Sequence, residues 1–227
     1  MRLLKASEYV LALMGLSALG YSSGTYLLAR TYQLMKGREF SRTLRAAAAP
    51  STETRSFSQP DLRKQEEGAV IGNLTIPRLG LSSIVIEGDS DRDLELAPGH
   101  VPETSLPGEG GNVAIAGHRD SFFRPLRRID KNDTITIATL NGDYAYRVVS
   151  TEIVQPDRVQ VLGPTKTETL TLITCYPFYF VGPAPQRFIV RAERIEQDAT
   201  SRLTVEGIPD ASRSSWHASD RSRQVSP

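Results

Sequence analysis

A long run of residues without a charged side chain, residues 9–29, limits the architectures open to this chain more than any other feature of its sequence. A helix rises 1.5 Å per residue, so a run of this length would span about 30 Å, the thickness of a bilayer's hydrocarbon core. We therefore predict that residues 1–35 form an N-terminal membrane anchor. Two alternatives remain open. One is a cleaved signal peptide, for which Arg2 and Lys5 would supply the basic start, and the other is a buried helix of a soluble protein.

The charges that flank this run bear on its orientation. Two basic residues, Arg2 and Lys5, precede the run, whereas several follow it. Those that follow are Arg30, Lys36, Arg38, Arg42 and Arg45. Because basic residues favour the cytoplasmic side of a membrane, the charge count by itself predicts that the C-terminal part of the chain stays in the cytoplasm.

Beyond the anchor, composition divides the chain into three parts. Residues 36–69 mix charged residues, serine, alanine and two prolines, which predicts a flexible linker, with a short helix at 39–49 as the alternative. Residues 197–227 are again polar and rich in serine, which predicts a disordered tail. With 27 basic against 26 acidic residues, the formal net charge of +1 argues against a dedicated nucleic-acid-binding protein.

The part between them, residues 70–196, has the pattern of a domain built from short strands. Apolar and polar residues alternate in several short runs, which are separated by glycine and proline. The predicted strands are 71–76, 84–87, 112–116, 133–138, 144–153, 169–174 and 187–195. Short helical turns are predicted only at 92–96 and 122–129, and Asn141-Gly142 predicts a type I′ hairpin turn. So many short strands in one domain indicate an all-β fold, in the form of a closed or nearly closed barrel.

Three chemically versatile side chains stand at the ends of these predicted strands. Cys175 directly follows one strand, His118 follows another after a glycine, and Arg187 begins the last strand. Cys175 is the only cysteine, so the chain forms no internal disulfide and no site built from several thiolates. Each residue alone has an ordinary structural explanation: a small buried hydrophobe for the cysteine, a hydrogen-bonding partner for the histidine, and an ion pair for the arginine.

Taken together, these positions and the sequence around them resemble a known family. The segments GHVPETSLPGEGGNVAIAGHRDSFFRPL and TLITCYPFYFVGPAPQRFIVRAERI closely resemble those of the sortases, the membrane-anchored cysteine transpeptidases. The shared features are TLITC at residues 171–175, AGHRD at residues 116–120, Arg187, and the order His, Cys, Arg along the chain. Both segments are most similar to class D sortases, and the resemblance covers about residues 70–195.

The resemblance implies a fold and a place in the cell. The fold would be a sortase-type eight-stranded β-barrel with short helices, tethered by one N-terminal transmembrane helix. The barrel would lie outside the cytoplasm, at the cell membrane. This orientation is the opposite of the one that the flanking charges predict.

The resemblance also implies chemical roles. Cys175 would be the nucleophile that forms a thioester, His118 the general acid and base, and Arg187 the stabiliser of the substrate carbonyl or oxyanion. The substrate would be a surface protein or pilin-like protein with an LPXTG-like C-terminal signal, and the acceptor an amine of cell-wall peptide or of a pilin lysine. Water as the acceptor would make the protein a protease, and neither a cofactor nor a metal ion is implied. The residues expected to line the substrate site are His100, Thr171 and Thr174, with loop residues 181–186.

Two functions of other classes remain open. In one, His100, His118 and Cys175 form a zinc site, since neutral imidazole and thiolate are ligands of that metal. These three residues lack the close spacing typical of such sites, and Arg187 nearby would repel the cation. The other alternative is a catalytically silent anchored β-domain that binds partner proteins.

Overall fold

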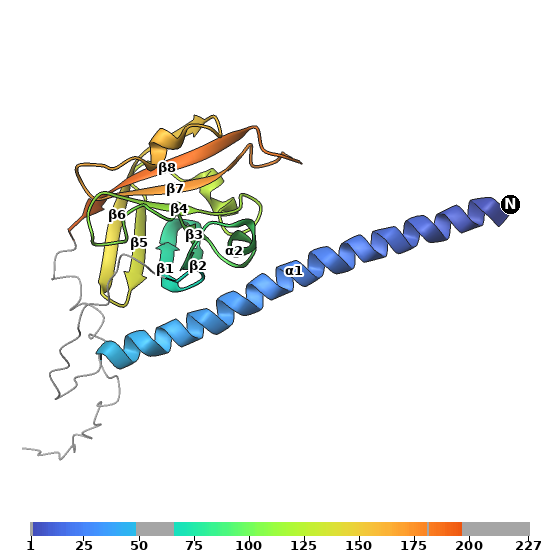
Figure 1. The fold of residues 1–227 in the computed structure, drawn as a ribbon, viewed down its shortest axis with the longest axis horizontal. Helices are drawn as coiled ribbons and strands as arrows, with labels where there is room; N and C mark the ends of the chain where they lie inside the picture. Colours follow the sequence, from blue (N-terminus) through green and yellow to red (C-terminus); the bar gives the residue numbers. More distant parts are fainter. Residues whose placement is uncertain (1, 49–65, 181, 197–227) are drawn as a thin grey trace, which may run out of the picture. The chain divides into compact units, whose positions relative to one another are not determined.

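Eight strands close into a β-barrel in the part of the chain that this computed structural model describes, residues 2–48, 66–180 and 182–196 (Figure 1). The strands are β1 (Val70–Ile76), β2 (Leu81–Glu87), β3 (Gly99–His100), β4 (Asn112–Ala116), β5 (Thr134–Thr139), β6 (Gly142–Val154), β7 (Thr169–Tyr176) and β8 (Gln186–Ile195). The helices are α1 (Arg2–Ala48) and α2 (Asp91–Leu96), with short 3-10 helices η1 (Pro77–Leu79), η2 (Arg124–Arg128) and η3 (Val159–Leu162). The predicted all-β barrel with short helices and an apolar N-terminal helix is confirmed.

The order of the strands around the barrel is β1-β2-β3-β4-β7-β8-β6-β5, and β5 pairs with β1 to close it. Most neighbouring strands are antiparallel, but β2 runs parallel to β3, and β4 runs parallel to β7. Successive side chains of a strand point to opposite faces, so Ile135 and Ile137 enter the core while Thr136 between them points outward. The alternation seen in the sequence is therefore the physical basis of the barrel interior.

All seven predicted strands are present, with ends that shift by up to three residues. Strand β3 was not predicted, because two residues are too few to show a period. The turn predicted at 92–96 is α2, where the Ser90 hydroxyl accepts a hydrogen bond from the amide of Asp93 at 3.3 Å and caps the helix. The turn predicted at 122–129 is the 3-10 helix η2.

The hairpin between β5 and β6 lies where it was predicted, but the turn type was wrong. Thr139 pairs with Gly142, so the two residues of the turn are Leu140 and Asn141 instead of Asn141-Gly142. Neither turn residue has a positive φ, which a type I′ turn requires, whereas Gly142 has a φ of 138°. The Thr139 hydroxyl stabilises this turn, since it accepts from the amide of Asn141 at 3.1 Å and donates to the carbonyl of Gly142 at 3.0 Å.

Helix α1 continues to Ala48, so the prediction of a flexible linker from residue 36 is wrong for residues 36–48. The alternative of a helix near 39–49 describes this segment better. The physical reason is tertiary packing: Phe40, which is 6% exposed, packs against Ile84 and Ile86 on the outer face of β2. The remainder of the predicted linker, residues 49–65, and the predicted tail, 197–227, lie outside the described residues.

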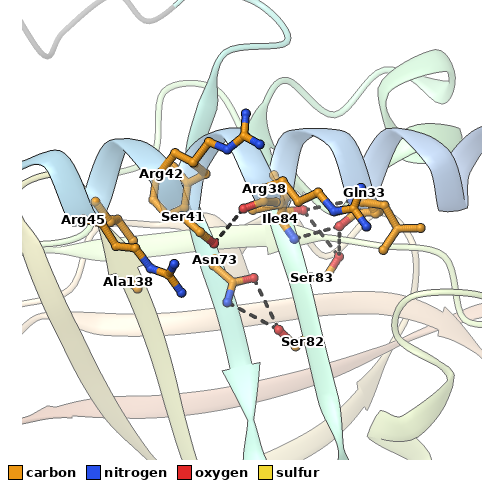
Figure 2. Close-up of a pocket in the computed structure, with 14 residues that line it drawn as sticks. Gln33, Arg38, Ser41, Arg42, Arg45, Asn73, Ser82, Ser83, Ile84 and Ala138 are labelled. Carbon is orange, nitrogen blue, oxygen red and sulfur yellow. Dashed lines mark hydrogen bonds between the residues drawn. The ribbon is translucent and has the colours of Figure 1, made fainter.

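The side chain of Gln33 fixes α1 on the barrel by hydrogen bonds to the backbone of β2 (Figure 2). Its amide oxygen accepts from the amide of Ile84 at 2.8 Å and from the Ser83 hydroxyl at 3.2 Å. Its amide nitrogen donates to the carbonyls of Ile84 at 3.3 Å and Leu96 at 3.2 Å. A groove of about 570 Å³ runs along this contact, and Arg38, Arg42 and Arg45 are among its lining residues.

The N-terminal part of α1 differs from the part that contacts the barrel in the exposure of its side chains. Its apolar side chains from Tyr9 onward are exposed in the protein, and none of its most apolar stretch is buried. By length and composition, α1 is able to cross a membrane.

An ion pair between Arg78 and Asp133 joins η1 to the start of β5. The Arg78 guanidinium donates to both carboxylate oxygens of Asp133, one of them at 2.6 Å, and Asp133 also accepts from the amide of Asp130 at 2.8 Å. The hydrogen bond from Arg78 is the main reason that the pKa of Asp133 is lowered. Because only the ionised carboxylate makes these contacts fully, Asp133 stabilises the fold above the pKa of an unfolded aspartate, about 3.9.

We predict that Asp133→Asn lowers the free energy of unfolding at pH 7. The free energy of unfolding of the variant should then fall less than that of the wild type as the pH is lowered. The wild-type contribution disappears as the pH falls from about 4 through the lowered pKa of Asp133, whereas asparagine does not titrate. Urea unfolding of the full chain in detergent micelles between pH 2 and 7 measures this difference. The matched control is Asp130→Asn, whose side chain is 75% exposed and 3.0 Å from Arg78, and which should change little.

Candidate active site

Cys175 and Arg187 lie opposite each other on neighbouring strands. Cys175 is near the end of β7, Arg187 is near the start of β8, and the antiparallel register pairs the two residues directly. Side chains of directly paired residues point to the same face of a sheet, with Cβ atoms about 4.5–5.5 Å apart. The fold therefore brings the predicted nucleophile and the predicted stabiliser together.

The face that these two side chains share is the outer face of the barrel. On β8, Phe188 and Val190 pack in or against the core, so the alternate residues Arg187 and Ile189 point outward. Ile189 packs with Ile173 of β7 in a small separate cluster, which confirms that this face lies outside the main core. Cys175 and Arg187 follow the same alternation, and both are half-buried.

His118 lies on the other side of β7 from Arg187, in the segment that follows β4. We call His118, Cys175 and Arg187 the row. The parallel register pairs Ala116 of β4 with Ile173, and the amide of Gly117 extends the ladder with a bond to the carbonyl of Ile173 at 3.0 Å. His118 is the next residue of the chain after Gly117, two residues beyond the end of β4, and so follows β4 where β7 carries Cys175. The imidazole, the thiol and the guanidinium are thus carried by three adjacent chain segments: the turn after β4, the end of β7 and the start of β8.

Gly117 is required by the tight return of the chain after β4. A Cβ atom at this position would lie 2.7 to 3.0 Å from ring atoms of Phe123, whose side chain is fully buried. The amide of Phe123 donates to the carbonyl of His118 at 3.0 Å, which closes the turn that carries the histidine. The glycine before the histidine was noted in the sequence, but its contact with Phe123 was not predicted.

The Arg187 side chain is turned toward the backbone of the loop between β7 and β8. Its guanidinium donates to the carbonyls of Ala184 at 3.2 Å and Gln186 at 3.1 Å. A guanidinium has five N–H donors, so these two bonds leave donors for a further acceptor. Arg187 therefore lies beside Cys175 and keeps N–H donors that can bind an oxygen of another molecule.

Aromatic residues surround the end of β7, and no role was predicted for them from the sequence. Tyr176, Phe178 and Phe188 contact one another, with ring centroids 5.3 to 6.4 Å apart. Two further rings, Tyr179 and Phe180, are 77% and 45% exposed on the loop that follows. The aromatic run after Cys175 was the signal for this apolar surface next to the row.

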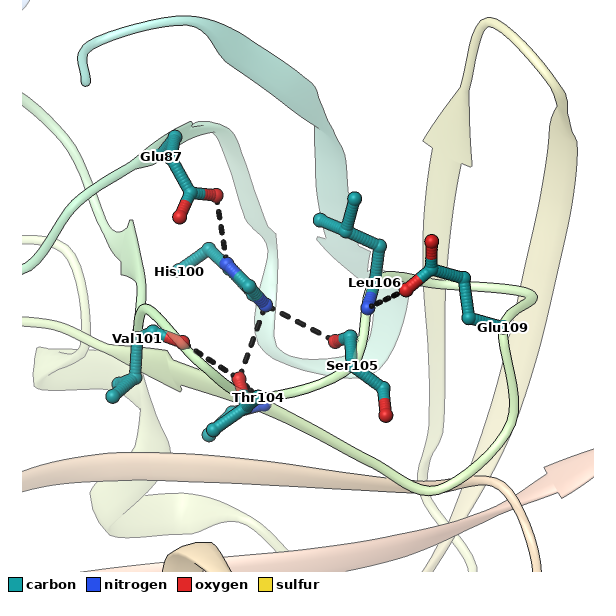
Figure 3. Close-up of polar contacts among 8 residues, drawn as sticks. Glu87, His100, Val101, Thr104, Ser105, Leu106 and Glu109 are labelled. Carbon is teal, nitrogen blue, oxygen red and sulfur yellow. Dashed lines mark hydrogen bonds and ion pairs between the residues drawn. The ribbon is translucent and has the colours of Figure 1, made fainter. Parts of the chain in front are cut away.

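His100 is buried instead of open to a ligand (Figure 3). One ring nitrogen, Nδ1, lies 2.8 Å from a carboxylate oxygen of Glu87, and the other, Nε2, lies 3.0 Å from the carbonyl of Ser105. The Thr104 hydroxyl is 3.1 Å from Nε2 and donates to the carbonyl of Val101 at 2.7 Å. Both nitrogens are therefore occupied, and the ring holds the loop between β3 and β4 in place.

Thr171 and Thr174 are also buried and hydrogen-bonded. Thr171 donates to the side-chain oxygen of Asn112 at 2.7 Å, and Thr174 donates to the carbonyl of Gly117 at 2.7 Å. Both bonds tie β7 to β4 or to the residue after it. The burial of His100, Thr171 and Thr174 does not support the prediction that they contact substrate, and points instead to a bracing role.

The residues proposed for a zinc site do not offer three free ligands. His100 uses both ring nitrogens in the contacts above. Among the residues that the structure describes, no group of three or more His, Cys, Asp or Glu side chains is arranged to hold a metal ion.

We predict that Gly117→Ala destabilises the protein by about 1–3 kcal/mol, the usual cost of overpacking. The added methyl group overlaps the buried Phe123 ring, so the turn that carries His118 must shift. Urea unfolding of the full chain in detergent micelles gives the free energy. Gly37→Ala is the control, because its Cβ would meet only a side-chain carbon of Ile84 at 3.8 Å, an ordinary contact, and its φ is not positive. Equal losses for both variants would contradict the steric argument.

Comparisons with known proteins identify the family of this chain. A family model described as "Sortase domain" matches residues 74–195. Sortase D of Bacillus subtilis (strain 168) is 35% identical over 133 residues, which cover 58% of this chain and 67% of that protein. Sortase A of Listeria monocytogenes is 30% identical over 114 residues, which cover 48% of this chain and 51% of that protein.

The solved structure of a Clostridium perfringens sortase D5 transpeptidase is similar to this chain with a TM-score of 0.61 and 25% identity. The match covers 74% of this chain and 99% of that one. The region matched by the family model is more than half of the chain and contains all three residues of the row. By its sequence, its barrel and its matched domain, this chain belongs to the sortase family of cysteine transpeptidases.

Proposed function

We propose that this protein is a membrane-anchored transpeptidase in which Cys175 is the nucleophile, His118 the general acid and base, and Arg187 the stabiliser of the oxyanion. The observation that carries the proposal is the direct register pairing of Cys175 with Arg187, while His118 lies two residues beyond the end of β4, the strand on the other side of β7. These residue types match the needs of acyl transfer: a sulfur nucleophile, a group that moves protons near neutral pH, and a fixed donor.

The reaction has two halves. In the first, the Cys175 thiolate attacks the carbonyl of a substrate peptide bond, Arg187 donates hydrogen bonds to the oxyanion, and protonated His118 gives its proton to the leaving amine. This half forms a thioester and releases the C-terminal part of the substrate. In the second, an acceptor amine attacks the thioester, His118 takes its proton, and the thiolate of Cys175 is regenerated. Water in place of the amine gives hydrolysis instead.

We propose an LPXTG-like sorting signal as the substrate, cleaved between Thr and Gly, on a surface or pilin-like protein. The amine acceptor would belong to a cell-wall peptide or a pilin lysine. Support comes from the family of the chain and from the apolar surface of Tyr179 and Phe180 beside the row, which suits an extended peptide. The substrate of this chain is thus a proposal from its relatives and its surface chemistry.

The catalytic proposal predicts that Cys175→Ala abolishes cleavage of quenched fluorescent peptides that carry LPXTG-type motifs. His118→Ala should lower kcat/KM by about 10²–10⁴-fold, since general acid–base catalysis contributes that much. Arg187→Ala should lower it by about 10²–10³-fold, as expected for the loss of an oxyanion donor. Added glycinamide should appear in the product of the wild-type reaction as an amide.

Arg191→Ala is the matched control for Arg187, because Arg191 lies on the same face of β8 and contacts Glu152 and Val161 away from the row. Its kcat/KM per folded molecule should stay within about twofold of the wild type. Persistent cleavage by Cys175→Ala would falsify the assignment of the nucleophile. Products without the glycinamide adduct would favour the protease alternative.

We also propose that α1 crosses the membrane once and that the barrel lies outside the cytoplasm. The single cysteine makes this directly measurable, since a thiol reagent can mark only Cys175. Intact cells that express the full chain should be labelled by a maleimide that does not cross membranes, and the Cys175→Ala variant should not. Labelling that requires lysis would place the barrel in the cytoplasm, as the flanking charges predict.

A further inference from the structure

Arg119, the residue after His118, binds the loop that follows Cys175. Its guanidinium donates to three backbone carbonyls, those of Pro177 at 3.1 Å, Phe180 at 2.7 Å and Gly182 at 2.9 Å. The carbonyl oxygens belong to one loop, whereas Arg119 belongs to the segment after β4. A single side chain therefore joins the two segments that carry the thiol and the imidazole.

A second type of contact strengthens the same junction. The guanidinium carbon of Arg119 lies 5.8 Å from the centre of the Phe180 ring, within the range of a cation–π interaction. Arg127 of η2 stands 5.5 Å from the ring of Tyr179 in the same way. Two arginines after β4 thus hold two successive aromatic residues after β7.

The chemistry of these contacts suits arginine in particular. Within the described residues, Arg119 has no ion pair with a carboxylate, so its charge acts on the loop carbonyls and the aromatic ring. Charged donors make stronger hydrogen bonds than neutral ones, and a planar guanidinium reaches several acceptors in fixed directions. A lysine has a single ammonium group on a flexible stem, and it cannot reproduce this arrangement fully.

We propose that Arg119 is a positioning residue that fixes the loop after Cys175 relative to His118. Arg119 directly follows His118 in the sequence. One of its carbonyl partners, Pro177, is two residues beyond Cys175. Arg119 bonds to the Phe180 carbonyl and contacts the Phe180 ring, while Arg127 contacts the ring of Tyr179. The inference rests on the proposed function for its catalytic consequence, but the contact itself is independent of any reaction.

The test compares Arg119→Ala and Arg119→Lys with the control Arg124→Ala in the full chain in detergent micelles. Arg124 is an exposed arginine of the same segment, and its side chain makes none of the hydrogen bonds or ion pairs found among the described residues. Three quantities are measured: the thermal unfolding midpoint, amide hydrogen exchange in peptides covering 176–188, and kcat and KM for the LPXTG-type peptides.

We expect Arg119→Ala to speed amide exchange in 176–188 by at least about fivefold, while the unfolding midpoint stays within a few degrees of the wild type. The kcat/KM should fall by at least about tenfold, with part of the loss in KM because the loop carries the exposed rings. Arg119→Lys should recover part of both effects, and Arg124→Ala should show neither.

Unchanged exchange in both Arg119 variants would overturn the proposal, whether or not any peptide is cleaved. Faster exchange with unchanged kcat/KM would overturn the positioning role and leave only a structural contact. If Arg119→Ala does not fold, the Lys variant decides by the same measurements. Failure of the proposed function is recognised separately, by cleavage that persists in Cys175→Ala while the exchange results stand.

Discussion

The parallel pairing of β4 with β7 is the contact on which the site depends. It places the end of one strand beside the end of another that lies more than fifty residues later in the chain, and the antiparallel pairing of β7 with β8 adds a third segment. Since neighbouring strands are about 4.8 Å apart, the pairing of β7 with β8 holds Cys175 and Arg187 close together, and the turn after β4 carries His118 on the other side of β7. The strands hold the backbone of Cys175 and Arg187, and the hydrogen bond from the amide of Phe123 to the carbonyl of His118 holds the turn that carries the histidine.

Buried hydrogen bonds reinforce this pairing from several directions. Thr174 bonds to the carbonyl just before His118, Thr171 bonds to Asn112 on the neighbouring strand, and His100 holds the loop that leads into β4. Each bond satisfies a polar group that would otherwise be costly to bury. Arg119 adds partly buried and exposed hydrogen bonds between the segment after β4 and the loop after β7. The polar residues near the row therefore act mainly through position, and the reactive groups themselves remain only partly buried.

Local patterns in the sequence were sufficient for much of the fold. Alternation revealed seven strands because each buries one face, and the long uncharged run revealed the helix that is able to cross a membrane. The patterns failed where contacts with residues distant in the sequence determine the local structure. Residues 36–48 have a polar composition, yet they are helical where Phe40 packs on β2. His100 resembles a ligand in the sequence, but Glu87 and Ser105, from other parts of the barrel, occupy its ring. No local pattern contains such partners.

The sequence by itself determined which reactive groups exist, one thiol among them, and that each stands at the end of a strand. It also determined the family, through motifs that surround those groups. Only the tertiary structure decided that Cys175 and Arg187 share the outer face and stand in register, and that the segment carrying His118 leaves β4 next to β7. The reason is that side chains alternate between faces with a period of two, so a shift of one residue in the pairing of β7 with β8 would separate Cys175 from Arg187. Register is a property of two strands together, and it depends on the core packing and loops that join them.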